Sequence, residues 1–405
     1  MLAPYVATAC SIGFIFAVLP ALAQPSPDGI MKNMDANRDG RISRQEWRGP
    51  PKGFDILDKN RDGQITAAEL QAGVPKSRAA TSRVPVIDVH VHVHGHPSST
   101  VQQRMNLDYA AAAAEAIAQM DKNNVRKSVI MVPPSVHAGR FDDKDILEQA
   151  RRHPDRLAVL GGGGTLNPLI HAIKPGAVTG EIRREFEEAA EETLRAGAIG
   201  FGEMSALHLS FFGQHPFEET SPDHPLFLAL ADVAARNDVP IDLHTEIVPL
   251  DMPTPPKLLA LSKNNPPRIK SNLAAFERLL AHNPKARIIL DHSADATGGR
   301  KAKVVRGLLE RHANLYMSLN VLPAYPLLEN LPLKGSGGID ADWLQLVKDF
   351  PDRFMVGSDQ FYSPPCANCK TFNSVTPTMR WIELLPDDIA GKVAYENPRR
   401  IFKLD

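Results

Sequence analysis

The chain has few cysteines, no run of basic residues and no glycine-rich dinucleotide-binding fingerprint, and each absence disfavours a class of protein. Its three cysteines are Cys10, Cys366 and Cys369. The last two form a C-x-x-C pair with no second pair, which disfavours a zinc ribbon and leaves a local disulfide or two free thiols. The formal net charge is −1, and basic and aromatic residues are not interleaved, so nucleic acid and anionic membranes are not expected as partners.

An apolar run covers residues 12–22 and ends at Ala21-Leu22-Ala23, which resembles the cleavage site of a secretory signal. The run is too short to span a membrane comfortably, and no Lys or Arg precedes it. We interpret residues 1–23 as a signal peptide, with an uncleaved anchor as the alternative. The expected location is periplasmic or secreted, with no stable membrane insertion after cleavage.

Two 12-residue segments repeat one pattern, DANRDGRISRQE at 35–46 and DKNRDGQITAAE at 58–69. Calcium favours oxygen ligands, and a loop of this length supplies them from positions 1, 3, 5, 7, 9 and 12. Glycine at position 6 permits a sharp turn, and isoleucine at position 8 lets two loops meet through a short strand. The candidate ligands, with backbone carbonyls at position 7, are Asp35, Asn37, Asp39, Arg41, Ser43 and Glu46, then Asp58, Asn60, Asp62, Gln64, Thr66 and Glu69.

These loops resemble the EF-hand family, which implies two calcium ions in a small α-helical module over residues 28–73. Pro50-Pro51 interrupts the connection between the loops, as in the compact calcium pairs of secreted bacterial proteins. The expected role is structural, or a calcium-dependent contact with the rest of the chain. Residues 74–85 are polar and contain proline, so we predict a linker there.

From residue 86 onwards, short apolar segments alternate with amphipathic or alanine-rich ones. This order predicts an α/β fold, a (β/α)8 TIM barrel over residues 86–405. An open doubly wound sheet is the alternative, but residues 161–164 lack the glycine spacing of a dinucleotide site. The predicted strands are 86–92, 128–132, 157–161, 198–203, 240–244, 287–292, 315–320 and 353–359. The clearest predicted helices are 108–124, 181–196, 225–237, 272–282 and 301–312.

Metal-ligating residue types stand at the ends of these strands. Alternation along residues 86–92 puts Asp88, His90 and His92 on one face, where two imidazoles can reach one zinc-type ion. A barrel carries its chemistry at the C-terminal ends of its strands. The other candidates at such ends are Glu203, His244, His292 and Asp359.

Six segments together resemble the amidohydrolase superfamily, and more closely the amidohydrolase-related group that also contains metal-dependent decarboxylases. They are VIDVHVH, DVPIDLHTE, NPKARIILDHS, NLYMSLN, FMVGSDQ and YENPRRIFKL. The resemblance implies that His90, His92, His244 and Asp359 bind metal and that Asp359 also moves protons. It implies that His292 binds a second metal or orients the substrate.

Glu203 departs from many members of that group, which have no carboxylate at the end of the fourth strand. Members with two metals carry a bridging carboxylate there. Glu203 therefore favours two ions, one held by His90, His92 and Asp359 and the other by His244 and His292. The competing interpretation is one ion, with Glu203 facing the substrate or buried nearby.

We therefore expect an exported metal-dependent hydrolase that cleaves an ester, lactone, amide or phosphoester with a metal-activated water. Asp359 and His292 are its expected catalytic residues, and zinc is the expected ion, in one or two copies. The partner is a small-molecule substrate, and enzymes of this group often form homodimers. One alternative is a mononuclear-metal, non-oxidative decarboxylase of an aromatic or unsaturated carboxylic acid. Another is a calcium-dependent adhesion protein without activity.

Overall fold

The computed structural model describes residues 31, 34–47, 54, 57–58, 60, 62–73, 82–94, 107–211, 215–292, 297, 301–321, 338–366 and 374–404. The chain divides into two compact units, Met1–Arg78 and Ala79–Asp405. The predicted signal peptide, residues 1–23, lies outside the described residues, as do residues 74–81 of the predicted linker.

The first unit contains a two-stranded antiparallel sheet of β1 (Arg41–Ser43) and β2 (Gln64–Thr66), followed by helix α3 (Ala67–Gly73). Ile42 lies opposite Ile65, as position 8 of the two loops predicts. Both isoleucines are fully buried with Phe54 and Leu70 in a small apolar core. The short sheet therefore joins the two loops through their apolar residues.

The second unit is a barrel of parallel strands. Its strands form two sheets, β16-β3-β4-β5 and β15-β14-β13-β10-β7-β6. The two sheets meet where β5 and β6 follow each other with one residue between them, so that β5 pairs with β4 and β6 with β7. The barrel strands are β3 (Val86–Val93), β4 (Val125–Met131), β5 (Leu157–Val159), β6 (Gly161–Gly162), β7 (Phe201–Ser205), β10 (Pro240–His244), β13 (Arg287–Asp291), β14 (Leu315–Leu319), β15 (Phe354–Val356) and β16 (Gln360–Tyr362).

The barrel closes where the last strands meet the first. β16 pairs in parallel with β3, and the Asp359 N–H donates to the His90 carbonyl at 2.9 Å. Ser358 donates through its backbone N–H and its hydroxyl to the Asp88 carboxylate, at 2.8 and 2.6 Å. A buried carboxylate with two such donors fixes the register between strands that are distant in sequence.

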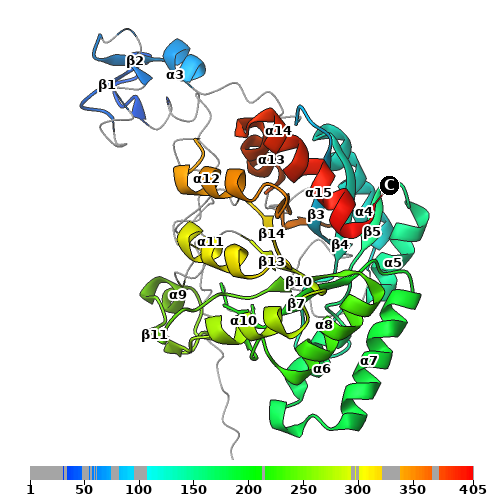
Figure 1. Ribbon diagram of the computed structural model, residues 1–405. Coiled ribbons are helices and arrows are strands. Elements are labelled where there is room, and N and C mark those ends of the chain that lie inside the picture. The colour runs from blue at the N-terminus through cyan, green and yellow to red at the C-terminus, as the bar shows by residue number, and fades with distance from the viewer. Residues whose placement is uncertain are drawn as a thin grey trace, which may run out of the picture. The chain divides into compact units, whose positions relative to one another are not determined.

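Helices cover the outside of the barrel, and the strands lie in its middle (Figure 1). The alternation of strand and helix along the chain confirms the predicted (β/α)8 fold. The helices are α4 (Tyr109–Lys122), α5 (Asp143–Arg152), α6 (Leu166–Ala172), α7 (Gly180–Arg195), α8 (Pro225–Asn237), α9 (Pro256–Leu261), α10 (Leu273–His282), α11 (Ala302–Arg311), α12 (Ala341–Asp349), α13 (Val375–Leu384), α14 (Asp387–Gly391) and α15 (Asn397–Phe402), with a 3₁₀ turn at Pro175–Ala177 and a π-helical turn at Lys392–Glu396.

Short strand pairs interrupt the loops after the barrel strands, namely β8 (Leu207–His208) with β9 (Glu218–Glu219) and β11 (Met252–Pro253) with β12 (Arg268–Ile269). Residues 82–85, which the composition assigns to the linker, lie within the second unit and contact its barrel domain. The Asn124 side chain donates to the carbonyls of Ser82 and Val84, and Arg83 forms an ion pair with Asp387 at 2.7 Å.

Candidate functional site

The barrel brings the six predicted metal ligands together. His90 and His92 lie within β3, Glu203 lies within β7, and His244 ends β10. His292 follows β13 directly, and Asp359 lies between β15 and β16. His292 and Asp359 have left-handed backbones, with φ of 62° and 55°. Such φ values are uncommon outside glycine, and here they turn the chain just where each strand ends.

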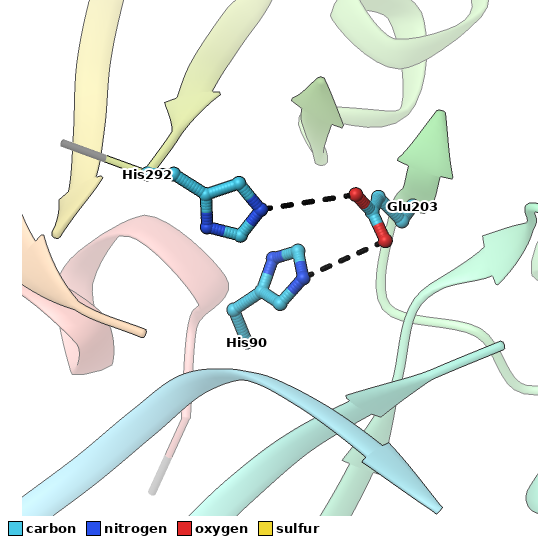
Figure 2. Close-up of side chains that lie close together, drawn as sticks. All are labelled: His90, Glu203 and His292. Atoms are coloured by element: carbon cyan, nitrogen blue, oxygen red, sulfur yellow. Dashed lines mark ion pairs between the residues drawn. The ribbon is translucent and has the colours of Figure 1, made fainter. Parts of the chain in front are cut away.

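Glu203 lies beside His90 and His292, with one carboxylate oxygen towards each ring (Figure 2). Its Oε2 atom is 3.7 Å from His90 Nε2 and 3.3 Å from His92 Nε2. Its Oε1 atom is 2.8 Å from His244 Nδ1 and 3.9 Å from His292 Nε2. One carboxylate oxygen therefore faces the pair of histidines from β3, and the other faces the histidines at the ends of β10 and β13.

Asp359 approaches the same histidines from the turn between β15 and β16, where the barrel closes. Its Oδ1 atom is 3.4 Å from His92 Nε2 and 3.9 Å from His90 Nε2, and its Oδ2 atom is 4.0 Å from His292 Nε2. The Asp359 side chain is 23% exposed, whereas that of His292 is 7% exposed. Asp359 is therefore the member of the group with the greatest access to a substrate or to solvent.

Burial and the neighbouring charged groups shift the pKa values of His90 and Glu203 in opposite directions. Burial alone would lower the pKa of His90, but the carboxylates of Asp242 and Asp291 raise this pKa well above its ordinary value. Burial alone would raise the pKa of Glu203, but hydrogen bonds from His244, His90 and His92 hold it well below its ordinary value. Glu203 is thus kept as the anion, which is the form that binds metal.

The donor set fits a divalent transition metal. His90 Nε2 and His92 Nε2 are 3.2 Å apart. Two nitrogens on one tetrahedral zinc ion, each bonded at about 2.0–2.1 Å, stand roughly 3.3 Å apart. Within the described part of the chain, the groups with ligand atoms close enough to share an ion include His90, His92 and Asp359, and also His90, Glu203 and His292.

The sequence-based prediction missed two aspartates beneath His90. His90 Nδ1 lies 3.1 Å from Asp242 Oδ1 and 3.6 Å from Asp291 Oδ1, and both side chains are fully buried. Burial raises the pKa of Asp242 well above its ordinary value, and the Asp291 charge adds to this. Strand alternation could have found Asp242, because it precedes His244 by two residues and shares its face.

The loop after β7 brings two further histidines to the group. The His208 ring packs on His244 with 4.0 Å between centroids, and on His215 with 4.5 Å. His208 belongs to the short pair of β8 and β9, which holds it in place. Its position in a loop, outside any barrel strand, gives no sequence signal comparable to the strand-end residues.

A family model described as amidohydrolase matches residues 87–404. The chain belongs to the amidohydrolase family. A second model, described as EF hand, matches residues 28–49 and 52–74, so the amidohydrolase domain follows an EF-hand pair. Both resemblances expected from the sequence are confirmed.

Solved structures similar to this amidohydrolase share little sequence with it. A probable 2-pyrone-4,6-dicarboxylic acid hydrolase from Acinetobacter baumannii is 14% identical, with 79% of this chain and 100% of that chain covered and a TM-score of 0.46. An uncharacterised TIM-barrel protein from Bordetella bronchiseptica is 15% identical, with 79% of this chain and 99% of that chain covered and a TM-score of 0.48. A 5-carboxyvanillate decarboxylase from Sphingomonas paucimobilis is 15% identical, with 80% of this chain and 100% of that chain covered and a TM-score of 0.42.

No curated protein matches the chain.

The EF-hand loops hold their ligand residues in the same way twice. Asp35 and Asp58 each accept from the N–H of the glycine at position 6, at 2.9 Å in both loops. Those glycines, Gly40 and Gly63, have φ of 84° and 83°, a backbone that residues with a Cβ rarely adopt. Glu46 Oε2 accepts from the Ser43 hydroxyl at 2.8 Å, and Glu69 Oε2 accepts from Thr66 at the same distance.

Cys366 is disulfide-bonded. Cys369, its predicted partner, lies outside the described residues. Among the residues that the structure describes, no helix combines the length and the apolar character that crossing a membrane requires.

Proposed function

We propose that this amidohydrolase is a hydrolase with two divalent ions bridged by Glu203, and that it cleaves an ester, lactone, amide or phosphoester of a small molecule. The observation that carries the proposal is the division of the Glu203 oxygens between two sets of histidines, at 3.3 and 3.7 Å on one side and 2.8 and 3.9 Å on the other. A carboxylate in this position can bind one ion with each oxygen.

In this proposal His90, His92 and Asp359 hold one ion, and His244 and His292 hold the other. The nitrogen and oxygen donors suit zinc, and the same donors suit manganese, iron or cobalt. When bound, such ions lower the pKa of a water molecule and polarise the carbonyl or phosphoryl group under attack.

Asp359 moves the proton in this reaction. Its carboxylate lies beside His92 and is partly exposed, so it can accept a proton from the attacking water and deliver it to the leaving group. His292 is the second catalytic residue, since its Nε2 lies 3.9 Å from Glu203 Oε1 and 4.0 Å from Asp359 Oδ2. The buried remainder of the site keeps the ligands in fixed positions.

The second candidate is a mononuclear-metal decarboxylase of an aromatic or unsaturated carboxylic acid. The observation in its favour is the 2.8 Å separation of Glu203 Oε1 and His244 Nδ1, which is a hydrogen-bond distance. If these two groups stay paired, a single ion remains on His90, His92 and Asp359.

Elemental analysis of the purified protein tests the proposal, after calcium is removed by mild chelation. We expect about two transition-metal ions per chain in the wild type and about one in Glu203→Ala, because the bridge holds the second ion. The matched control is Glu219→Ala, which removes an exposed carboxylate of β9. One ion in both wild type and Glu203→Ala would overturn the two-metal proposal.

The reaction itself is tested in oxygen-18 water on esters, lactones, amides and phosphoesters, with aromatic carboxylic acids alongside. Oxygen-18 in the product supports hydrolysis. Release of carbon dioxide without label in the remaining product supports the decarboxylase instead.

We also propose that the protein is exported to the periplasm or beyond, binds two calcium ions in its EF-hand pair and forms a homodimer. The repeated loops and the disulfide at Cys366 support export, because disulfides persist in oxidising compartments. Cell fractionation, calcium titration and sedimentation test these three points separately.

A further inference from the structure

Asp242 and Asp291 form a buried pair of carboxylates next to His90, one of the six proposed metal ligands. We call these six residues the ligand group: His90, His92, Glu203, His244, His292 and Asp359. The side chains of Asp242 and Asp291 are each 0% exposed. Among the described residues, none of their four oxygens makes a hydrogen bond of good geometry. Unpaired carboxylates in an apolar interior are strongly destabilising, so a chain that keeps two of them together gains something other than stability from them.

The polar atom that both carboxylates approach is Nδ1 of His90, at 3.1 Å from Asp242 and 3.6 Å from Asp291. The other nitrogen of the same ring, Nε2, faces His92 and Glu203. A carboxylate that accepts from Nδ1–H places the proton on that nitrogen and leaves the lone pair of Nε2 for an ion. The pair therefore lies where it can set both the tautomer and the orientation of His90.

Close packing surrounds these groups. A Cβ at Gly357 would lie 2.6 Å from the Cβ of His90, and a Cβ at Gly202 would lie 2.8 Å from the Cβ of Asp242. Glycine at these two positions therefore leaves room for His90 and Asp242 on the neighbouring strands.

We propose that Asp242 and Asp291 are positioning residues that hold the His90 ring in the orientation and tautomer in which Nε2 is the metal ligand. The inference rests on the proposed function in one respect, that His90 binds an ion. It adds two residues that neither family model nor strand-end position assigns.

The test compares Asp242→Ala, Asp291→Ala and Asp242→Asn with the wild type in the full-length protein. Zinc affinity is measured by competition with a chelator, and the melting temperature is measured after metal removal. The visible absorption of the cobalt-substituted protein reports the geometry around the ion. We expect each alanine variant to weaken zinc binding by about 10- to 100-fold and to alter the cobalt spectrum.

The stability of the protein after metal removal should change in the opposite direction. Removing one buried, unpaired carboxylate should keep or raise the melting temperature. Asp242→Asn should recover part of the zinc affinity, because its side-chain oxygen can still accept from His90. The control is Asp143→Asn, whose carboxylate is buried but accepts from Gly162 and Thr165, so it should lower stability and leave zinc affinity unchanged.

Four results would overturn the inference. Alanine variants with wild-type zinc affinity would show that the pair does not act on His90. A loss of affinity that merely follows a loss of stability would indicate a structural role. The ligand atoms of Asp242, Asp291 and His90 lie within 4.8 Å of one another, so these residues could also hold an ion of their own. If each alanine variant bound one metal ion fewer per chain than the wild type, while the remaining ions bound with unchanged affinity, the aspartates would be direct ligands and not positioning residues. A wild type that binds no zinc would overturn the proposed function as well, which separates the two failures.

Discussion

Oε1 of Glu203 and Nδ1 of His244 lie 2.8 Å apart, closer than two ligands of one tetrahedral zinc ion, which stand roughly 3.3 Å apart. If a second ion were held by both atoms, they would have to separate, whereas a single ion held by His90, His92 and Asp359 would leave them paired. This contact therefore distinguishes the two-metal site from the one-metal site. The predictions below test the groups around it.

Asp359→Asn should abolish most turnover while the metal stays bound. The amide keeps an oxygen for the ion but cannot take up the proton, and loss of a general base typically costs about 10²–10⁴-fold in rate. Turnover and metal content per chain are measured on the same preparation. Asp352→Asn, an exposed aspartate paired with Lys392, is the control. Near-normal turnover in Asp359→Asn would contradict the assigned role.

Gly357→Ala should damage the site through packing alone. Its Cβ would lie 2.2 Å from Ser318 Oγ and 2.6 Å from the His90 Cβ, so His90 or the strand must shift. We expect a loss of about 1–3 kcal/mol in the free energy of unfolding, together with weaker metal binding. Urea unfolding and metal titration measure the two effects. Gly180→Ala, where a Cβ meets nothing within 4 Å, should leave both unchanged.

His215 should make the protein less stable in mild acid. Burial, together with the nearby His244, lowers the pKa of His215 from its ordinary value of 6.5 to about 4. The unfolded chain therefore takes up this proton more readily than the folded one, so stability falls as the pH drops from 6.5 towards 4. His215→Gln should remove roughly 1–3 kcal/mol of that fall. Urea unfolding at several pH values would refute this if the two proteins follow the same curve.

Calcium binding should depend on the glutamate at position 12 of each EF-hand loop. Glu46→Gln and Glu69→Gln each remove one charge from a loop and should weaken calcium binding there by roughly tenfold or more. Calorimetric titration of the full chain measures both sites. If both variants bind two calcium ions as tightly as the wild type, the loops are not the calcium sites.

Much of the fold follows from the sequence because the strand signal is local. The segment PIDLH at 240–244 is buried along its whole length, and β10 has these bounds. The last predicted strand, 353–359, is shorter in the structure, where β15 covers Phe354–Val356. The reason lies in the backbone, since Asp359 has a φ of 55° and cannot continue an extended strand.

The same backbone feature explains what the sequence did not reveal about the site. In a regular strand Asp291 and His292 would point to opposite faces. The left-handed backbone of His292, with a φ of 62°, breaks this alternation, so both residues face His90. Period-two reasoning predicts the strand-end histidines but not a partner that stands next to one of them.

The proposed metal ligands come from both ends of the barrel domain, which meet where β16 pairs with β3. His90 and His92 come from the first barrel strand, and Asp359 comes from the last turn before β16 pairs with it. The contacts between β16 and β3 are among the longest in sequence separation, and such contacts form late because long loops must close first. A nascent chain stalled before residue 359, or one trimmed back past it by a protease, would lack one of the proposed ligands however well its other strands had folded. Tightly bound metal would then mark the molecules that have completed folding, and a chelator-resistant fraction could be used to count them.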